Sequence, residues 1–256
     1  MSRQLPVLVR QQARLLRQDP VPVVVLTAMP LLLAAFIKPA FRPALLAAGQ
    51  RGANGAEQAV PGMAIMFGYF LLFTIGFAVF REHGWHTWDR LRAAPATTAD
   101  VIGAFTCFPL FVVVAQQAIV FAVGSVVFDL HVRGSVLALA MIGGCSAFTV
   151  VALGWCMVAV CRSAMQLNAV ANLVALLLAG LGGALTPRSA LPGWVGSIAP
   201  ATPSYWAMRG YQQVIVGGAG VRGALVSSAV LVAFGIGLSI VAILRFRVGD
   251  EKESFA

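Results

Sequence analysis

The sequence predicts an all-α integral membrane protein with six transmembrane helices, an amphipathic N-terminal interfacial helix and a re-entrant segment before the last helix. Two observations predict this fold class. Of the 256 residues, 59% are hydrophobic and only 11% are charged, whereas about a quarter of the residues in a soluble domain are charged. The apolar residues also gather in six long runs, and a bilayer-spanning helix needs about 20 mostly apolar residues. The chain is therefore predicted to lie largely within the membrane.

Each of the six apolar runs is long enough, or nearly so, to cross the bilayer. They cover residues 20–37, 60–80, 101–128, 135–161, 166–185 and 225–245. Within hydrocarbon every backbone N–H and C=O must find a partner inside the protein, which favours helices for runs of this length and composition. In a chain of 256 residues six such helices leave little room for anything else, so a single membrane domain is predicted.

The basic residues predict the orientation in the membrane. With the N-terminus inside, eleven Lys and Arg residues fall on the cytoplasmic side and seven fall outside. Cytoplasmic loops carry the excess of basic residues in membrane proteins, and the cluster before the first span usually has most influence. The sequence therefore predicts a multi-pass protein of the cell membrane with both termini in the cytoplasm. The formal charge of +9 is explained by this topology, so no nucleic-acid partner is predicted.

The first 19 residues have the pattern of an amphipathic helix that lies on the membrane surface. The apolar positions at helical spacing are Leu5, Leu8, Val9 and Leu16, and the basic positions on another face are Arg3, Arg10, Arg14 and Arg17. Such a helix lies in the headgroup plane with its arginines toward anionic lipid. A basic tail without fixed structure is the alternative interpretation.

The connection before the last run, residues 186–224, is unlike the others. It is apolar and aromatic but is interrupted by Pro187, Pro192, Pro200 and Pro203, so it cannot form one straight helix. The piece Ser204–Val216 has few helix breakers and is predicted to form a short helix that enters the outer leaflet without crossing it. The residues of interest in this re-entrant segment are Pro192, Trp194, Pro203, Tyr205 and Trp206.

Several kinds of chemistry are missing from the sequence. The only lysines are Lys38 and Lys252, and neither follows the glycine pattern of a phosphate-binding loop. The acidic residues all lie in connections, in tails or at the boundaries of the runs, whereas intramembrane catalysis and ion coupling use ionisable groups inside the spans. The four cysteines have no paired spacing. The sequence therefore predicts no catalytic residue, no metal site and no bound cofactor in this chain.

The second connection, Arg81–Asp100, is the most charged stretch of the chain. Its middle is predicted to form a short amphipathic helix with Trp88 and Leu91 on one side and Asp89, Arg90 and Arg92 toward water. A protruding helix that combines charge with aromatic side chains is suited to docking into a groove on a soluble partner. A solvated loop whose tryptophans anchor it at the membrane interface is the alternative.

Two sequence elements resemble those of type-2 ABC export permeases. The element after the second span is similar to the family pattern E-x-x-G-x-x-x-R-L-x-x-x-P at Glu82, Gly84, Thr87, Arg90, Leu91 and Pro95. Arg90, Leu91 and Pro95 keep the spacing of that pattern, whereas Glu82 and Gly84 do not. The element before the last span is similar at Pro187, Leu191, Pro192, Trp194, Pro200, Pro203 and Tyr205. Both elements occur at the expected places among six spans, so the resemblance covers essentially the whole chain.

The resemblance implies an architecture and a set of partners. Residues 1–256 would form one type-2 transmembrane domain, with the N-terminal helix at 1–19, a cytoplasmic coupling segment at 81–100 and the outer re-entrant segment at 186–224. Two such subunits pair, as copies or as paralogues, and each meets a separate cytoplasmic ATPase that binds ATP and Mg²⁺. The residues implied at or near this ATPase contact are Glu82, Trp88, Arg90, Leu91 and Arg92.

A few residues inside the spans are candidates for a substrate path. The polar ones are Gln116 and Gln117 in the third span and Asn168 and Asn172 in the fifth, and the aromatic ones are Phe70, Phe73 and Phe77 in the second. The alternative for the amides is hydrogen bonding between helices, which contributes about 0.6 kcal/mol on average in membranes. The alternative for the phenylalanines is packing or contact with lipid.

These observations together predict the permease subunit of an ATP-driven exporter. Its cargo is expected to be a hydrophobic or amphiphilic compound, such as a drug, an antibiotic or a lipid, that moves out of the cell. A membrane scaffold or assembly subunit without a transport path is the alternative.

Overall fold

The computed structural model describes residues 5–18, 20–50, 52–72, 76, 79–80, 98–187 and 190–245. Every regular element of this part of the chain is a helix, which confirms the predicted all-α class. Five of these helices are long and apolar enough to cross a membrane: Val23–Ala47, Phe105–Val127, Val136–Val160, Ala164–Leu181 and Val221–Arg245. The predicted run at 60–80 is described only in part, so the sixth span stays a prediction.

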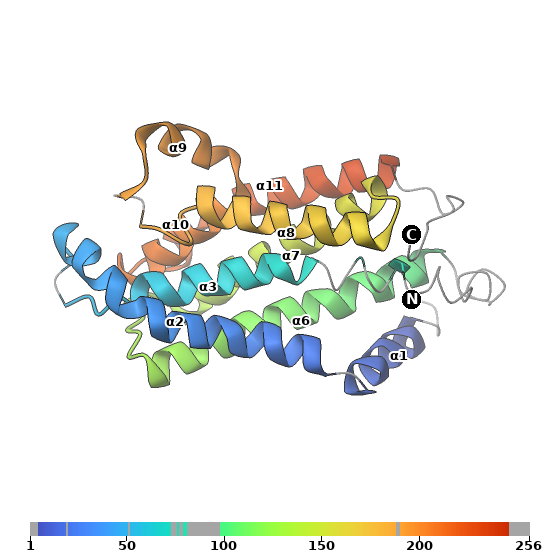
Figure 1. The fold of residues 1–256 in the computed structure, drawn as a ribbon, viewed down its shortest axis with the longest axis horizontal. Helices are drawn as coiled ribbons and strands as arrows, with labels where there is room; N and C mark the ends of the chain where they lie inside the picture. Colours follow the sequence, from blue (N-terminus) through green and yellow to red (C-terminus); the bar gives the residue numbers. More distant parts are fainter. Residues whose placement is uncertain are drawn as a thin grey trace.

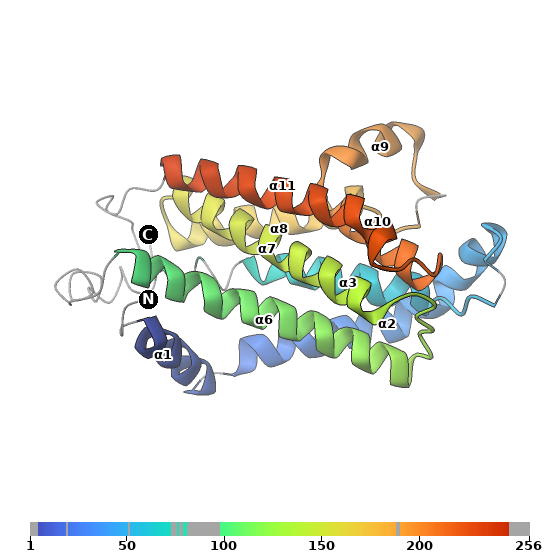
Figure 2. The same cartoon turned by 180° about the vertical axis from the view of Figure 1, so that it is seen from behind.

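The long helices run side by side along the length of the molecule (Figures 1 and 2). In chain order they are α2 (Val21–Ala47), α3 (Ala56–Phe70), α6 (Thr98–Val127), α7 (Val136–Val160), α8 (Ala164–Leu181) and α11 (Val221–Arg245). The helix α1 (Leu5–Gln18) lies at one end of this bundle and packs against α6. The short helices α9 (Gly193–Ile198), η2 (Ala199–Ala201) and α10 (Pro203–Ile215) follow α8, and α9 lies at the opposite end from α1. We call these two ends the α1 end and the α9 end.

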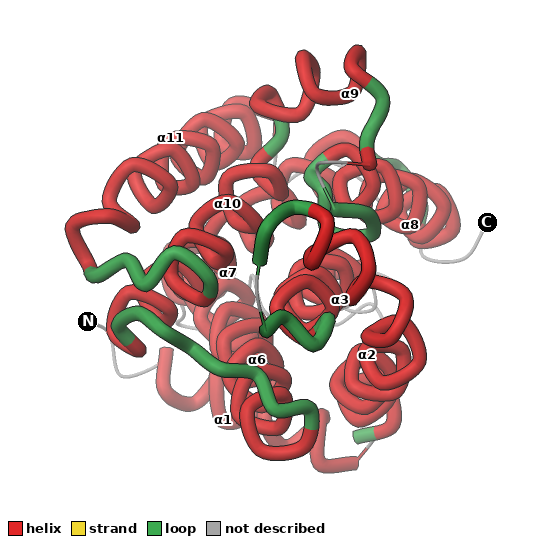
Figure 3. Tube along the Cα trace, turned by 90° about the vertical axis from the view of Figure 1, so that its left-hand side faces the viewer, coloured by secondary structure: helices red, strands yellow, loops and turns green. Residues whose placement is uncertain are grey.

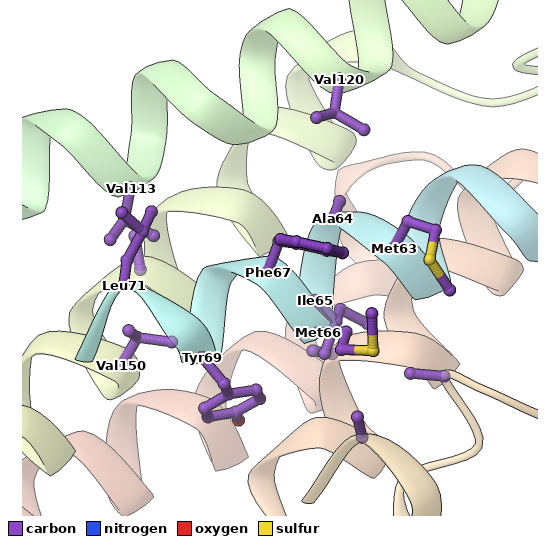
Figure 4. Close-up of a cluster of buried hydrophobic side chains, with 14 of the residues drawn as sticks. Met63, Ala64, Ile65, Met66, Phe67, Tyr69, Leu71, Val113, Val120 and Val150 are labelled. Carbon is purple, nitrogen blue, oxygen red and sulfur yellow. The ribbon is translucent and has the colours of Figure 1, made fainter. Parts of the chain in front are cut away.

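The helix α3 lies at the centre of the bundle. It contacts α2, α6, α8 and α10, and the end view shows it among these helices (Figure 3). Thirteen of its 15 residues are buried. Its side chains form much of the apolar core together with Val113 and Val120 of α6 and Val150 of α7 (Figure 4). The helix pair α7 and α11 forms the most extensive contact on the other side of the bundle.

The helix α2 lies on the outside of the bundle and is longer than its sequence run predicted. It continues past residue 37 through Pro39 and Pro43 and ends at Ala47. A proline inside a membrane helix is tolerated when neighbouring groups satisfy the freed backbone. At 27 residues the helix is about 40 Å long, more than the hydrocarbon core of about 30 Å. A helix of this length crosses the hydrocarbon either at a tilt or with residues to spare.

Side chains at the α9 end tie the connection before α3 to the connection after α6. The Lys38 ammonium donates to the Phe128 carbonyl at 2.6 Å, and the Asn54 amide donates to the carbonyls of Phe128 and Asp129 at 3.2 and 3.0 Å. The Glu57 carboxylate accepts the N–H groups of Asn54 and Gly55 at 3.2 and 3.1 Å. The Asn54 side-chain oxygen in turn accepts the N–H of Ala56 at 2.8 Å. These bonds satisfy N–H groups at and just ahead of the start of the helix, which explains why α3 begins at Ala56, ahead of the apolar run.

The segment between α8 and α11 is broken into short helices, as its prolines predict. The helix α10 covers Pro203–Ile215, almost the same residues as the predicted short helix at 204–216. It contacts α3, α7, α8 and α11. Its place relative to a membrane surface, and hence the re-entrant character of the segment, stays a prediction.

Candidate functional site

The four amide side chains that the sequence places inside the spans lie in two different environments. Asn168 and Asn172 of α8 are exposed, whereas Gln116 and Gln117 of α6 are 1% and 4% exposed. The first pair faces the outside of the bundle and the second pair faces its interior. The structure therefore does not bring the four amides together.

The Asn168 and Asn172 side chains bond to each other along one face of α8. The Asn172 amide donates to the Asn168 side-chain oxygen at 2.6 Å and to the Asn168 carbonyl at 2.9 Å. The exposed residues around them are apolar, among them Leu173, Leu176 and Leu177. Apart from Gln166 at the start of α8, the pair is therefore a polar spot on an apolar surface of a span-length helix.

Gln117 forms a hydrogen bond between α6 and α10. Its side-chain oxygen accepts from the Tyr211 hydroxyl, and Tyr211 is fully buried. The Tyr211 ring also lies against Phe121, with ring centroids 4.8 Å apart. This arrangement is the interhelical hydrogen bonding that the sequence left open as the alternative for Gln117.

Gln116 is buried without a hydrogen-bond partner among the described residues. Neither its side-chain oxygen nor its nitrogen is paired there, and the same is true of the Gln117 nitrogen and the Tyr69 hydroxyl. Burial of an unpaired polar group costs about 1–3 kcal/mol in mutational data. The interior around α3 and α6 thus holds polar groups whose hydrogen-bonding capacity is not fully used within this part of the chain.

Sequence analysis missed a second pair of amides, at the α9 end, in which a buried glutamine bonds to a half-buried one. Gln58 of α3 is fully buried, and its amide donates to the Gly183 carbonyl at 2.8 Å. Its side-chain oxygen accepts from the Gln212 amide of α10. Gln58 precedes the apolar run at 60–80, so the sequence assigned it to the connection before the second span and not to a helix interior. The signal that points to it is the spacing of four residues from Gly62, which places both on one face of α3.

The phenylalanines of the second run are described only in part. Phe70 is half-buried and packs edge-on against the Phe67 ring, with centroids 5.5 Å apart. Phe67 and Phe80 are buried. Phe73 and Phe77 lie outside the described residues.

The predicted re-entrant segment places its aromatic residues on different sides. Trp194 of α9 is 64% exposed, whereas Tyr205 of α10 is buried. The Trp206 indole donates to the Pro200 carbonyl at 2.8 Å, and the Arg209 guanidinium lies 5.1 Å from the centroid of the Trp206 ring. Pro192 precedes α9, and Pro203 is the first residue of α10, where a proline costs no helical hydrogen bond.

The turn after α8 is packed tightly between α3 and α10. Gly182 lies so close to Ser204 that a Cβ there would be 2.2 Å from the serine hydroxyl oxygen, and a Cβ on Gly62 would be 2.1 Å from the Ala184 carbonyl oxygen. The Ser204 hydroxyl donates to the Leu178 carbonyl near the end of α8. These contacts fix α10 against α3 and the end of α8.

The residues implied at an ATPase contact, Glu82, Trp88, Arg90, Leu91 and Arg92, lie outside the described residues. They belong to the connection that leads to α6. The first described residue after this connection is Thr98, where α6 begins. Their role stays a prediction from the sequence.

Comparison with known proteins identifies the family of this chain. No curated protein matches the chain. The sequence profile of the ABC-2 type transporter family matches residues 3–216, which extend from the start of α1 to the end of α10. Because this match covers most of the chain, the protein belongs to the ABC-2 type transporter family and is the permease subunit of an ABC transporter.

Proposed function

We propose that this permease subunit exports a hydrophobic or amphiphilic compound, such as a drug, an antibiotic or a lipid, with energy from ATP hydrolysed by a separate subunit. The family implies partnership with an ATPase. The direction of transport, the class of cargo and the pairing of two permease subunits are our proposal. The termini are placed in the cytoplasm on the distribution of basic residues.

The exposed pair Asn168 and Asn172 carries the proposal of a path. Exposure of amides to hydrocarbon is unfavourable, because their remaining hydrogen-bonding groups find no partner there. The two side chains satisfy each other only in part, since one amide bonds to one oxygen and one carbonyl. This face of α8 therefore favours contact with water, with a polar part of the cargo or with a second subunit. If this face of α8 lines a path between two permease subunits, it meets water, cargo and the second subunit.

The surroundings of the asparagine pair suit an amphiphilic cargo. Exposed leucines flank the pair on α8, so a compound there would meet an apolar wall with one polar spot. Ligand sites are usually built in this way, from apolar surface with a few polar groups that fix orientation. Phe70, Phe73 and Phe77 are proposed to extend this wall. Gln117 is proposed to support it through its bond from α6 to Tyr211 of α10. Gln116, which is buried without a described partner, is proposed to stay a candidate for the path.

The first test removes the amides from the proposed path. We expect Asn168→Leu/Asn172→Leu to lower export by about tenfold, equal to about 1.4 kcal/mol, while thermal unfolding of the purified protein stays unchanged. Export is measured as accumulation of a fluorescent amphiphile in inverted vesicles that contain the transporter and its ATPase. The matched control is Val170→Leu, which alters another exposed residue of α8 without removing an amide.

The outcome also separates a transporter from a scaffold. If both the double variant and Asn172→Trp export at the rate of the unaltered protein, this face of α8 lines no path. If the unaltered protein assembles with its ATPase but exports nothing, the result would favour the scaffold instead.

The second test addresses the coupling segment, residues 81–100. We expect the tagged chain to co-purify with an ATPase, and we expect Glu82→Ala/Arg90→Ala to reduce both recovery of the ATPase and export by about tenfold. A contact that involves charged residues and loses one partner typically weakens by this much or more. The control is Arg222→Ala, an exposed arginine at the start of α11. Normal recovery and export by the double variant would contradict the proposed coupling role.

A further inference from the structure

A groove lies between α6 and α7 outside the proposed path. Its cavity volume is about 340 Å³, within the range of about 300–1,000 Å³ that small-molecule sites occupy. Ala118, Ala122 and Ala140 line its exposed mouth, and Gln117, Gly143 and Tyr211 lie at its floor. We call this feature the α6–α7 groove. None of its lining residues carries a charge.

The groove extends over the depth of one leaflet. From Gln117 to the end of α6 at Val127 the helix rises by about 15 Å, which is half of a hydrocarbon core of about 30 Å. Both helices that form it are long and apolar enough to span the membrane. The medium at its mouth is therefore the acyl chains of lipids.

The size of the groove decides between possible occupants. A helix from a second subunit has a diameter of at least about 10 Å, so a 15 Å length of it occupies about 1,200 Å³, several times the volume of the cavity. Water needs several polar partners to occupy a cavity. Ten of the thirteen lining residues are apolar, and the hydroxyls of Ser125 and Tyr211 already donate to protein atoms, which leaves mainly the Gln117 nitrogen as a partner. A single hydrocarbon chain is slim enough and apolar enough to enter.

We propose that the α6–α7 groove is a binding site for one acyl chain of a membrane lipid. Within a membrane the favourable free energy of binding comes from packing, because the lining atoms of an unfilled groove lack dispersion contacts. Small residues on both helices create the space. On Gly144 an added Cβ would meet no other atom within 4 Å.

The floor of the groove connects the bound chain to α10. Tyr211 comes from α10 and is held by Gln117 of α6 and by the Phe121 ring. On Gly143 of α7 an added Cβ would lie 3.3 Å from the Tyr211 hydroxyl oxygen, so the wall is close-packed there. A chain in the groove thus contacts three helices at once and supports the position of α10.

The test uses a lipid that labels what its chain touches. The purified full-length chain is placed in vesicles of phosphatidylcholine and phosphatidylglycerol that contain a phosphatidylcholine with a diazirine near the end of one acyl chain. After irradiation, mass spectrometry maps the labelled residues. We expect labelling of Ala118 and Ala122 at about five times the level of Ile240 and Val241, which are exposed on α11.

A side chain that fills the groove should abolish the stronger labelling of the groove relative to α11. We expect Gly144→Leu to reduce labelling in the groove about fivefold, to the level of α11. The matched control is Gly237→Leu on α11, where an added Cβ also meets nothing within 4 Å. Thermal unfolding of both variants checks that the fold is kept.

Three results would overturn the proposal. They are equal labelling of the groove and of α11, unchanged labelling in Gly144→Leu, and reaction of Ala122→Cys with a membrane-impermeant thiol reagent beyond the level of the unaltered chain. The last result would mean that water fills the groove. The experiment contains neither ATPase nor cargo, so its outcome is independent of the proposed export function.

Discussion

Replacement of Gly62 by alanine is expected to destabilise the protein by about 3 kcal/mol, at the upper end of the range for overpacked cores. The new Cβ would lie 2.1 Å from the carbonyl oxygen of Ala184 and 3.1 Å from its carbonyl carbon. These atoms belong to the backbone, so no side-chain rotation relieves the clash. The turn after α8 must move away from α3, and it is also packed against α10. The measurement is thermal unfolding of the detergent-solubilised chain together with its recovery as a monodisperse peak.

Gly68 provides the matched control for this prediction. It lies on the same helix, and a Cβ there would be 3.8 Å from the Gln117 amide nitrogen, an ordinary contact. Alanine is favoured over glycine within helices by about 0.5–1 kcal/mol, so Gly68→Ala should leave the stability unchanged or raise it. Equal effects of the two substitutions would show that α3 does not pack against the turn as described.

Replacement of Gln58 by leucine is expected to cost about 2 kcal/mol of stability. The amide group of Gln58 bonds to the Gly183 carbonyl and to Gln212. Leucine leaves the buried Gly183 carbonyl and the half-buried Gln212 amide without this partner, and an unpaired buried group costs about 1–3 kcal/mol. The loss is measured as a lower midpoint of thermal unfolding.

The double variant Gln58→Leu/Gln212→Leu tests the cause. Replacement of both partners of a hydrogen bond by apolar groups can be nearly neutral, so the second change should recover part of the stability that the first one lost. The Gly183 carbonyl stays unpaired in both variants, so recovery should be incomplete. If the two losses simply add, the Gln58 and Gln212 side chains do not interact.

Much of the fold follows from hydropathy, because the length of a bilayer span constrains the elements. The runs at 135–161 and 225–245 correspond closely to α7 and α11. The ends are harder to predict, since local chemistry sets them. α2 continues through two prolines beyond its apolar run. α3 starts early because the Asn54 side chain accepts the N–H of Ala56 and the Glu57 carboxylate accepts the N–H groups of the two residues ahead of the helix.

The environment of the amides could not be predicted in the same way. Gln117 and Asn172 both lie in the middle of long apolar helices, and periodicity alone does not say which face of a helix meets its neighbours. That depends on how the helices are rotated in the bundle. The sequence therefore left interhelical bonding and a polar wall open for both. The structure places Gln117 against Tyr211 and leaves Asn172 on the surface.

The burial of α3 has a consequence for the membrane that holds an unassembled subunit. Thirteen of the 15 residues of this helix are enclosed by its neighbours, so along its length the axis of the bundle is filled with side chains. Over the described length of α3, a single copy of the chain therefore blocks ion flow along the axis of its own bundle.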